Sequence, residues 1–228
     1  MSAPRILVLQ HHPLEHPAAF ADALRRGGAE LDVVRAFAGD GHPRALAPYD
    51  GLIVMGGPMS VGDDDLHPWL RDERALVAQA IAADTPTLGV CLGSQLIASV
   101  AGAAVGRGPA AEIGWYRIAP TMDARDDPLF TDDAMPFAAL EWHADGFSLP
   151  PGAVGLASSA QYPVQAFRIG RRVYGLLFHV EIDAEQIERW CDAFAGGDQT
   201  LGGDAAPDLE GANRRALRIA ERLFLSSG

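Results

Sequence analysis

The chain has 228 residues, of which 48% are hydrophobic, and this is enough to build one sizeable core. Eighteen basic residues against thirty acidic ones give a formal charge of -12, which argues against nucleic acid or an anionic membrane as a partner. No run of about 18 apolar residues is present, and the apolar start is too short for a secretory signal. We therefore expect a cytoplasmic protein that does not span a membrane.

The first half of the sequence alternates short apolar runs with amphipathic stretches, which is typical of βαβ units around a parallel sheet. Strands are predicted at residues 5–10, 30–37, 51–57 and 87–90. Helices are predicted at residues 18–28, at residues 68–84, and over residues 95–100, where a third helix opens. This order predicts an α/β fold.

After Gly102 the sequence carries short strands with polar and aromatic residues and no long helices between them. Residues 164–170 and 172–179 form a predicted hairpin that returns the chain to the sheet. This part of the sequence therefore predicts a small antiparallel addition to the parallel core.

The C-terminal part is predicted to contain two helices, at residues 183–196 and 212–225, joined by a mobile loop at residues 197–211. No composition shift or linker divides the chain. We expect a single domain over residues 1–228 with a three-layer, flavodoxin-like α/β fold, in which helices cover both faces of a mostly parallel central sheet.

Cys91 stands between Gly89 and Gly93 at the point where a buried strand ends and a helix begins. A turn of this kind lifts a nucleophile clear of the sheet, and the glycines let neighbouring backbone approach closely. The backbone N–H of Leu92 is placed to bind a developing oxyanion, and the helix N-terminus favours a thiolate. Cys91 is therefore the predicted nucleophile.

Among the seven histidines, His179 follows an apolar strand and has a carboxylate two residues further on, at Glu181. Residues i and i+2 of an extended segment face the same side, so Glu181 can hold the ring nitrogen that the thiol does not use. This predicts His179 as general base and acid and Glu181 as its orienting partner. Each motif alone also has a purely structural interpretation.

A third motif, Gly56-Gly57-Pro58, ends another buried strand. Two glycines before a proline make a rigid turn with exposed backbone N–H groups. We expect Gly57 to supply a second oxyanion donor opposite Cys91. The alternative is an ordinary turn between a strand and a helix.

Other polar and aromatic residues leave two interpretations open. Residues 11–16, HHPLEH, place three histidines and a glutamate at a spacing that suits a metal, but a loop at the rim of the site is favoured. Glu112 and Asp145 either contact a substrate amine or belong to a solvated surface. Three tryptophans either line a substrate groove or belong to the core: Trp69, Trp115 and Trp142.

Five motifs occur in the order GGPMSV, PTLGVCLGSQLIA, EIGW, EWHADGF and FHVE, and with them the sequence resembles class I glutamine amidotransferases of the Cys-His-Glu type. More narrowly, it is similar to stand-alone proteins called GMP synthase-like glutamine amidotransferases, which include γ-glutamyl peptidases. The resemblance implies that family's fold, the triad Cys91, His179 and Glu181, and oxyanion-hole amides at Gly57 and Leu92.

The resemblance also implies a substrate site. Gln95 is expected to contact the α-amino-acid end of glutamine, and the backbone of Trp142, His143, Ala144 and Asp145 to hold the same end. The implied reaction is thiolate attack on a γ-amide carbonyl, loss of ammonia or an amine, and hydrolysis of a γ-glutamyl thioester. No metal and no cofactor is expected.

The sequence departs from the family pattern where Leu177 and Val180 replace a glutamine and a proline around the histidine. It also carries no synthetase domain and no S-G-G-x-D-S nucleotide loop. The first expectation is hydrolysis of a small γ-glutamyl amide. The alternatives are a glutaminase subunit that delivers ammonia to a separate acceptor or synthetase subunit, and a catalytically silent regulatory module.

Overall fold

The computed structural model describes residues 3–194 and 201–226. Within these residues one sheet runs in the order β2-β1-β3-β4-β9-β8-β7-β5-β6. The parallel strands are β1 (Arg5–Gln10), β2 (Glu30–Arg35), β3 (Gly51–Val54), β4 (Thr87–Val90) and β9 (Val173–Leu176). The predicted α/β fold class is confirmed.

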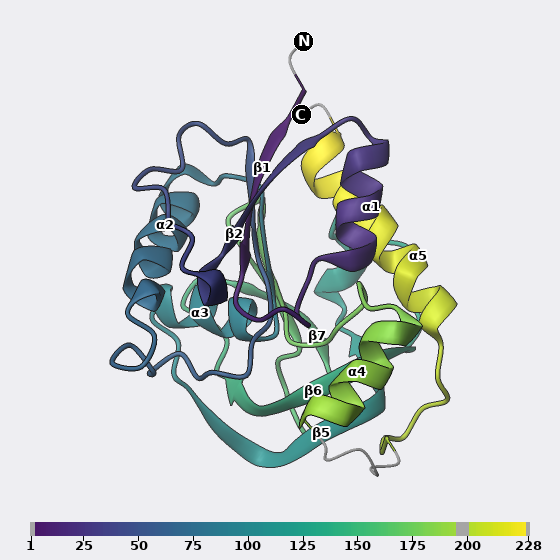
Figure 1. Cartoon of the computed structure of the whole chain (residues 1–228). Helices are drawn as coiled ribbons and strands as arrows, with labels where there is room; N and C mark the ends of the chain where they lie inside the picture. Colours follow the sequence, from purple (N-terminus) through teal and green to yellow (C-terminus); the bar gives the residue numbers. More distant parts are fainter. Residues whose placement is uncertain (1–2, 195–200, 227–228) are drawn as a thin grey trace.

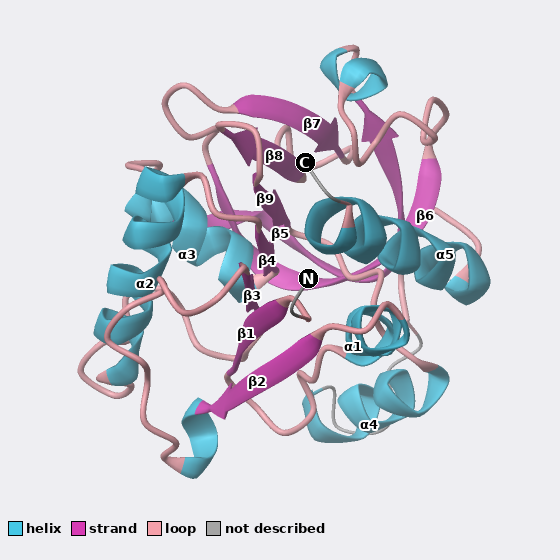
Figure 2. Cartoon of the chain, turned by 90° about the horizontal axis from the view of Figure 1, so that it is seen from above, coloured by secondary structure: helices cyan, strands magenta, loops and turns pink. Residues whose placement is uncertain are grey.

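Helices cover both faces of the parallel strands (Figure 1). They are α1 (Ala18–Arg26), α2 (Trp69–Ala83), α3 (Leu92–Val100), α4 (Ala184–Phe194) and α5 (Leu209–Ala220). Figure 2 shows α2 and α3 on one side of the sheet and α1, α4 and α5 on the other. Because both faces are covered, every residue of β3, β4 and β9 is buried, and these strands are apolar throughout except for Thr87.

The antiparallel strands continue the same sheet beyond β9. They are β5 (Val105–Pro120), β6 (Phe137–Phe147), β7 (Val154–Ser158) and β8 (Ala166–Ile169). The predicted hairpin is present as β8 and β9, joined through residues 170–172. The long pair of β5 and β6 reaches the carboxyl edge of the parallel strands, which places part of β6 opposite Cys91.

Several predicted boundaries were wrong. The strand predicted at residues 51–57 ends at Val54, so the Gly56-Gly57 turn lies wholly outside it. The helix predicted to open at Gln95 begins at Leu92, directly after the cysteine. The strand predicted at residues 30–37 ends at Arg35 in a 3-10 turn.

The predicted loop at residues 197–211 is partly wrong as well. Residues 197–200 and the predicted end of the preceding helix, residues 195–196, lie outside the described residues. From Leu201 onward the segment is held against β5, because the N–H of Gly202 donates to Ile113 and that of Trp115 donates to Gly202. The next helix, α5, begins at Leu209 and not at Ala212, with the Asp208 side chain accepting from Gly211.

None of the described helices has the length and apolar character that crossing a bilayer requires.

Candidate active site

Loops at the carboxyl edge of the parallel strands bring the predicted site residues together. His11 follows β1, Gly57 follows β3, Cys91 follows β4 and His179 follows β9. Open α/β sheets bind their ligands at this edge, where the strands end and the helices begin.

Cys91 occupies the turn between β4 and α3 with φ at 49° and ψ at -109°, a backbone conformation that residues other than glycine rarely adopt. Its surroundings leave no space for Cβ atoms. A Cβ on Gly89 would lie 2.6 Å from the backbone of Gly93, and one on Gly93 would overlap the carbonyl oxygen of Val54. Tight packing thus holds the strained turn and presents the thiol at the start of α3.

His179 and Glu181 form a buried pair, with 2.7 Å between His179 Nδ1 and Glu181 Oε1. The second carboxylate oxygen of Glu181 accepts the N–H of Val180 at 3.0 Å. Valine therefore supplies a hydrogen bond that proline, the family's residue at this position, lacks.

The electrostatic surroundings of His179 favour its charged form. Burial by itself lowers the pKa of an imidazole, but the carboxylate of Glu181, 2.7 Å from Nδ1, and the nearby Cys91 thiol raise the pKa of His179 well above its usual value. The edge of Trp190 packs on the ring, with the two centroids 4.8 Å apart. This arrangement favours a protonated His179 beside the thiol.

A cavity of about 300 Å³ opens in front of Cys91. Leu92 is the first residue of α3, so its N–H has no acceptor within that helix. Gly57 lies in the cavity wall, where a Cβ would come within 3.0 Å of a methyl carbon of Leu92. Gly57 therefore lies next to the side chain of Leu92, the other residue predicted to supply an oxyanion donor.

The residues expected to hold substrate line the same cavity: Gln95, Trp142, His143, Ala144 and Asp145. The amide of Gln95 donates to the carbonyl oxygen of Asp145 at 3.2 Å, and the Asp145 carboxylate accepts from the Ser60 hydroxyl at 3.1 Å. Cys91 Sγ lies 3.9 Å from the carbonyl oxygen of Trp142. Asp145 thus faces the cavity.

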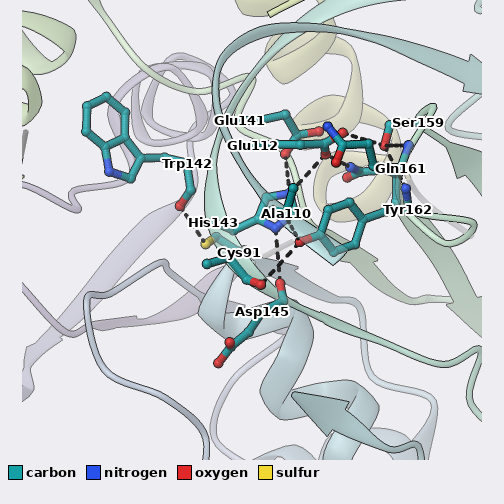
Figure 3. Close-up of polar contacts among 12 residues, drawn as sticks. Cys91, Ala110, Glu112, Glu141, Trp142, His143, Asp145, Ser159, Gln161 and Tyr162 are labelled. Atoms are coloured by element: carbon teal, nitrogen blue, oxygen red, sulfur yellow. Dashed lines mark hydrogen bonds and ion pairs between the residues drawn. The ribbon is translucent and has the colours of Figure 1, made fainter. Parts of the chain in front are cut away.

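Glu112 does not contact solvent or the cavity, so both sequence interpretations of it were wrong. It is buried together with Glu141 and His143 in a cluster of ionisable side chains that β5 and β6 form (Figure 3). His143 Nε2 lies 3.0 Å from Glu141 and 3.4 Å from Glu112. Ser159 and Gln165 each donate to Glu112 at 2.8 Å.

The surroundings of the histidine at the centre of this cluster favour its charged form. Burial opposes the charge, but the neighbouring carboxyl groups of Glu112 and Glu141 raise the pKa of His143 to about 10. Its Nδ1 donates to the carbonyl of Asp145 at 3.1 Å, and its Nε2 faces the two carboxyl groups. The three side chains also have the spacing of metal ligands, and burial raises the pKa of Glu141 above its usual value.

The histidine-rich segment at residues 11–16 divides between two places. His11 is buried against Glu73, which it meets at 2.9 Å, and Glu73 also meets His42 at 2.9 Å. His11 Nδ1 lies 3.0 Å from the carbonyl oxygen of Gly56, next to the oxyanion turn. The segment does not gather its own histidines into a metal site.

Glu15, from the same segment, enters the cavity wall. Sequence reasoning placed this glutamate only in a possible metal set, since its reach depends on the path of a loop, and it did not name Ser60 or Arg107, which also line the cavity. Trp142 also lines the cavity, whereas Trp115 is buried in the core and Trp69 stacks on His11 with 5.3 Å between ring centroids.

Comparisons with known proteins show the family to which the chain is similar. The family model for class I glutamine amidotransferases matches residues 18–189. The glutamine amidotransferase-like protein YfeJ of Salmonella typhimurium is 34% identical over 187 residues, which cover 81% of this chain and 78% of that protein.

A larger relative and a solved structure extend the comparison. A GMP synthase of Aeropyrum pernix is 30% identical over 192 residues, 83% of this chain but 35% of the synthase, so most of that enzyme has no counterpart here. The crystal structure of a glutamine amidotransferase from Methylobacillus flagellatus gives a TM-score of 0.87 at 30% identity, covering 100% of this chain and 98% of that one. The chain therefore belongs to the class I glutamine amidotransferase family.

Proposed function

We propose that this protein hydrolyses a small γ-glutamyl amide by a Cys91, His179 and Glu181 triad, without a metal or cofactor. The observation that carries the proposal is the strained Cys91 turn, which presents a thiol to a cavity while the buried His179–Glu181 pair interacts with it. A cysteine with only a structural role would gain nothing from such strain.

The proposed reaction begins with attack of the Cys91 thiolate on the amide carbonyl carbon. The N–H groups of Gly57 and Leu92 bind the oxyanion of the tetrahedral intermediate. His179 protonates the leaving nitrogen, the C–N bond breaks and a γ-glutamyl thioester remains on Cys91. Water, deprotonated by His179, then hydrolyses the thioester and returns the thiol.

In this proposal residues 142–145 of β6, together with Gln95, hold the α-amino-acid end of the γ-glutamyl group. Asp145 offers a carboxylate to the α-ammonium group, and Arg107, which also lines the cavity, offers a guanidinium to the α-carboxylate. A cavity of about 300 Å³ is at the lower end of small-molecule sites, which span about 300–1,000 Å³. An amino-acid-sized substrate suits it.

A second candidate is a glutaminase subunit that delivers ammonia to a separate synthetase. The match to 35% of a GMP synthase favours this candidate. The remaining residues of that relative belong to the same chain as its amidotransferase part, and here a separate subunit would take their place. In such a pair this protein would turn over glutamine slowly until the acceptor subunit is added.

The test is an assay of free glutamate and released amine over glutamine, γ-glutamyl dipeptides and γ-glutamyl methylamide. Stand-alone hydrolysis predicts steady turnover of at least one compound by the purified chain and its loss in Cys91→Ala. Turnover of dipeptides without glutamine turnover would exclude the ammonia-delivery alternative. Activity that survives Cys91→Ala would refute the mechanism.

Labelling with a γ-glutamyl chloroketone separates both enzymes from a silent regulatory module. Native protein should be alkylated at Cys91 faster than unfolded protein, since the site binds the γ-glutamyl group and activates the thiol. An unlabelled native protein with a reactive unfolded form would leave the silent module as the remaining explanation.

A further inference from the structure

Glu15 lies in the short segment between β1 and α1, which other residues hold in place. The carbonyl oxygen of Leu14 accepts from the side chains of Gln186 and Trp190 of α4, at 2.7 and 2.8 Å. The N–H of Glu15 donates to the carbonyl of His12 at 3.0 Å. The backbone that carries Glu15 is therefore held by α4 and by a turn within its own segment.

The carboxyl group of Glu15 is buried and lacks a hydrogen-bond partner at Oε2. A buried carboxylate without partners costs free energy, and the polar groups of native proteins are rarely left in this state. Glu15 also lines the cavity that contains Cys91. A donor brought by a substrate would satisfy it.

The carboxyl group lies on the His179 side of the cavity. A Cβ placed on Gly56 would be 2.5 Å from Glu15 Oε2 and 3.3 Å from Cε1 of His179, so both groups converge on the space that this glycine leaves free. The residues proposed to hold the α-amino-acid end lie elsewhere in the cavity wall, where Gln95 donates a hydrogen bond to the carbonyl oxygen of Asp145. Because His179 protonates the leaving nitrogen in the proposed function, Glu15 lies where the leaving group departs.

We propose that Glu15 is the leaving-group contact of this site, accepting a hydrogen bond from the nitrogen of the scissile amide. This inference rests on the proposed function and names its substrate class: γ-glutamyl amides of ammonia or primary amines, whose nitrogen keeps an N–H to donate. It also assigns a role to a residue outside the Cys-His-Glu set.

The contact strengthens during the reaction. In the tetrahedral intermediate the nitrogen takes a proton from His179 and becomes cationic, with at least one further hydrogen directed at Glu15. The oxyanion then reforms the carbonyl, the C–N bond breaks with its electron pair going to nitrogen, and a neutral amine departs. A carboxylate beside the nitrogen stabilises the cationic stage more than the neutral substrate, which is the requirement for catalysis.

The charges around Glu15 agree with this role. Burial and the nearby Glu181 raise the pKa of Glu15 to about 7, while His179 and His11 act in the opposite direction. The other ionisable groups in the wall of the cavity are Cys91, Arg107, His143 and Asp145. A carboxyl group with this pKa is available as a carboxylate near neutral pH and gains from a cationic partner.

The experiment compares γ-glutamyl methylamide with γ-glutamyl methyl ester in the wild type and in Glu15→Gln. An ester oxygen carries no hydrogen to donate, and both substrates form the same thioester. We expect kcat/KM for the amide to fall about 10- to 100-fold, the range of a hydrogen bond between charged groups, and kcat/KM for the ester to change less than about threefold. The amide pH profile of the wild type should lose its rise through about pH 7 in the variant.

A partition measurement tests the same contact in reverse. With the ester as donor and methylamine as acceptor, wild-type thioester should divide between hydrolysis and formation of γ-glutamyl methylamide. In Glu15→Gln the fraction of thioester that forms γ-glutamyl methylamide should fall by about the same factor as kcat/KM for amide hydrolysis. The reason is that the attacking amine occupies the position from which the leaving amine departs. Glu188→Gln, the same change at an exposed position of α4, should leave every value unchanged.

Each outcome decides the inference. An equal loss for amide and ester would assign Glu15 to thioester hydrolysis or to the fold, and no loss for either would show that it makes no contact; both overturn the proposal. Chloroketone labelling of Cys91 at the wild-type rate establishes that the variant is folded. If Glu15→Gln does not fold, Glu15→Asp, which keeps the charge on a shorter side chain, should show the same selective amide loss. A wild type without Cys91-dependent turnover of any compound would remove the proposed function itself, and the inference with it.

Discussion

In the parallel half of the sheet the site depends on glycines and a strained backbone, whereas in the antiparallel half it depends on buried charge. Cys91 is held at φ 49° by the close approach of Gly93 to β3. The β6 wall is held by Glu112, Glu141 and His143, ion-paired at 3.0 and 3.4 Å. Central strands can fix a side chain by packing alone, because neighbouring backbone surrounds it. The long β5–β6 pair at the end of the sheet has fewer neighbours, and a buried ion cluster supplies the rigidity.

The largest effect should come from Cys91→Gly, which tests whether the parallel half stores strain for catalysis. Turnover should be lost by about 10⁴-fold or more, as for other missing nucleophiles. The free energy of unfolding should rise by about 1 kcal/mol, since glycine adopts a positive φ without cost. Calorimetry of Cys91→Ala, which removes the thiol but keeps the Cβ, is the control. A Cys91→Gly protein less stable than Cys91→Ala would show that the turn is unstrained.

Gly93→Ala should break the packing of the same half. Its Cβ would overlap the carbonyl oxygen of Val54, which is backbone and cannot rotate away. We expect the free energy of unfolding to fall by about 3 kcal/mol or more in urea titrations. Gly41→Ala, at a position with open space, should change it by less than about 0.5 kcal/mol. Similar values for both would mean that the elbow tolerates a shift of β3.

The antiparallel half should respond to pH instead. The pKa of His143 is raised to about 10, so the folded protein binds a proton that the unfolded chain releases near pH 6.5. The stabilising contribution of His143 is fully present below about pH 6.5 and is lost as pH rises toward 10. Stability should decline over that window by up to about 1.4 kcal/mol per pH unit. His143→Gln should remove this slope, and an unchanged slope would place the charge elsewhere.

The smallest effect is expected at the contact between the two halves. The Ser60 hydroxyl, in the loop after β3, donates to Asp145 of β6 at 3.1 Å. Ser60→Ala should raise KM for a γ-glutamyl substrate by about 2- to 10-fold, the worth of one such hydrogen bond, and leave kcat within about twofold. Steady-state kinetics measure the split. A fall in kcat with constant KM would place Ser60 in the chemical step instead.

The parallel half could be predicted from the sequence because its signals are local. Apolar runs marked β1, β3 and β4, and the glycines around Cys91 marked the turn, so the fold class and the neighbourhood of Cys91 and His179 followed from pattern alone. The start of α3 was placed late because a cysteine and glycines are poor helix formers, although the elbow requires the helix to begin at Leu92.

The antiparallel half resisted prediction because its signals are long-range. Glu112 is typical of a surface residue by type, and its burial depends on Glu141 and His143, which reach it only when β5 pairs with β6. The position of Glu15 in the cavity wall could not be predicted for a similar reason, because the sequence HHPLEH does not indicate the path of this loop. The segment after Leu201 was predicted as a loop from its glycines, yet glycine is what allows Gly202 to lie against Gly114 of β5.

The carbonyl oxygen of Leu14 accepts hydrogen bonds from both Gln186 and Trp190 and thereby connects α4 to the surroundings of His179 and Glu15. Trp190 packs on the His179 ring, and Leu14 precedes Glu15. Replacing α4 with a helix of different sequence would therefore disturb the His179 ring and the Glu15 segment together, and also Trp142, whose ring packs on Trp190 and Phe194 of the same helix. One helix is thus coupled to three parts of the cavity wall at once, and its sequence tunes them as a set.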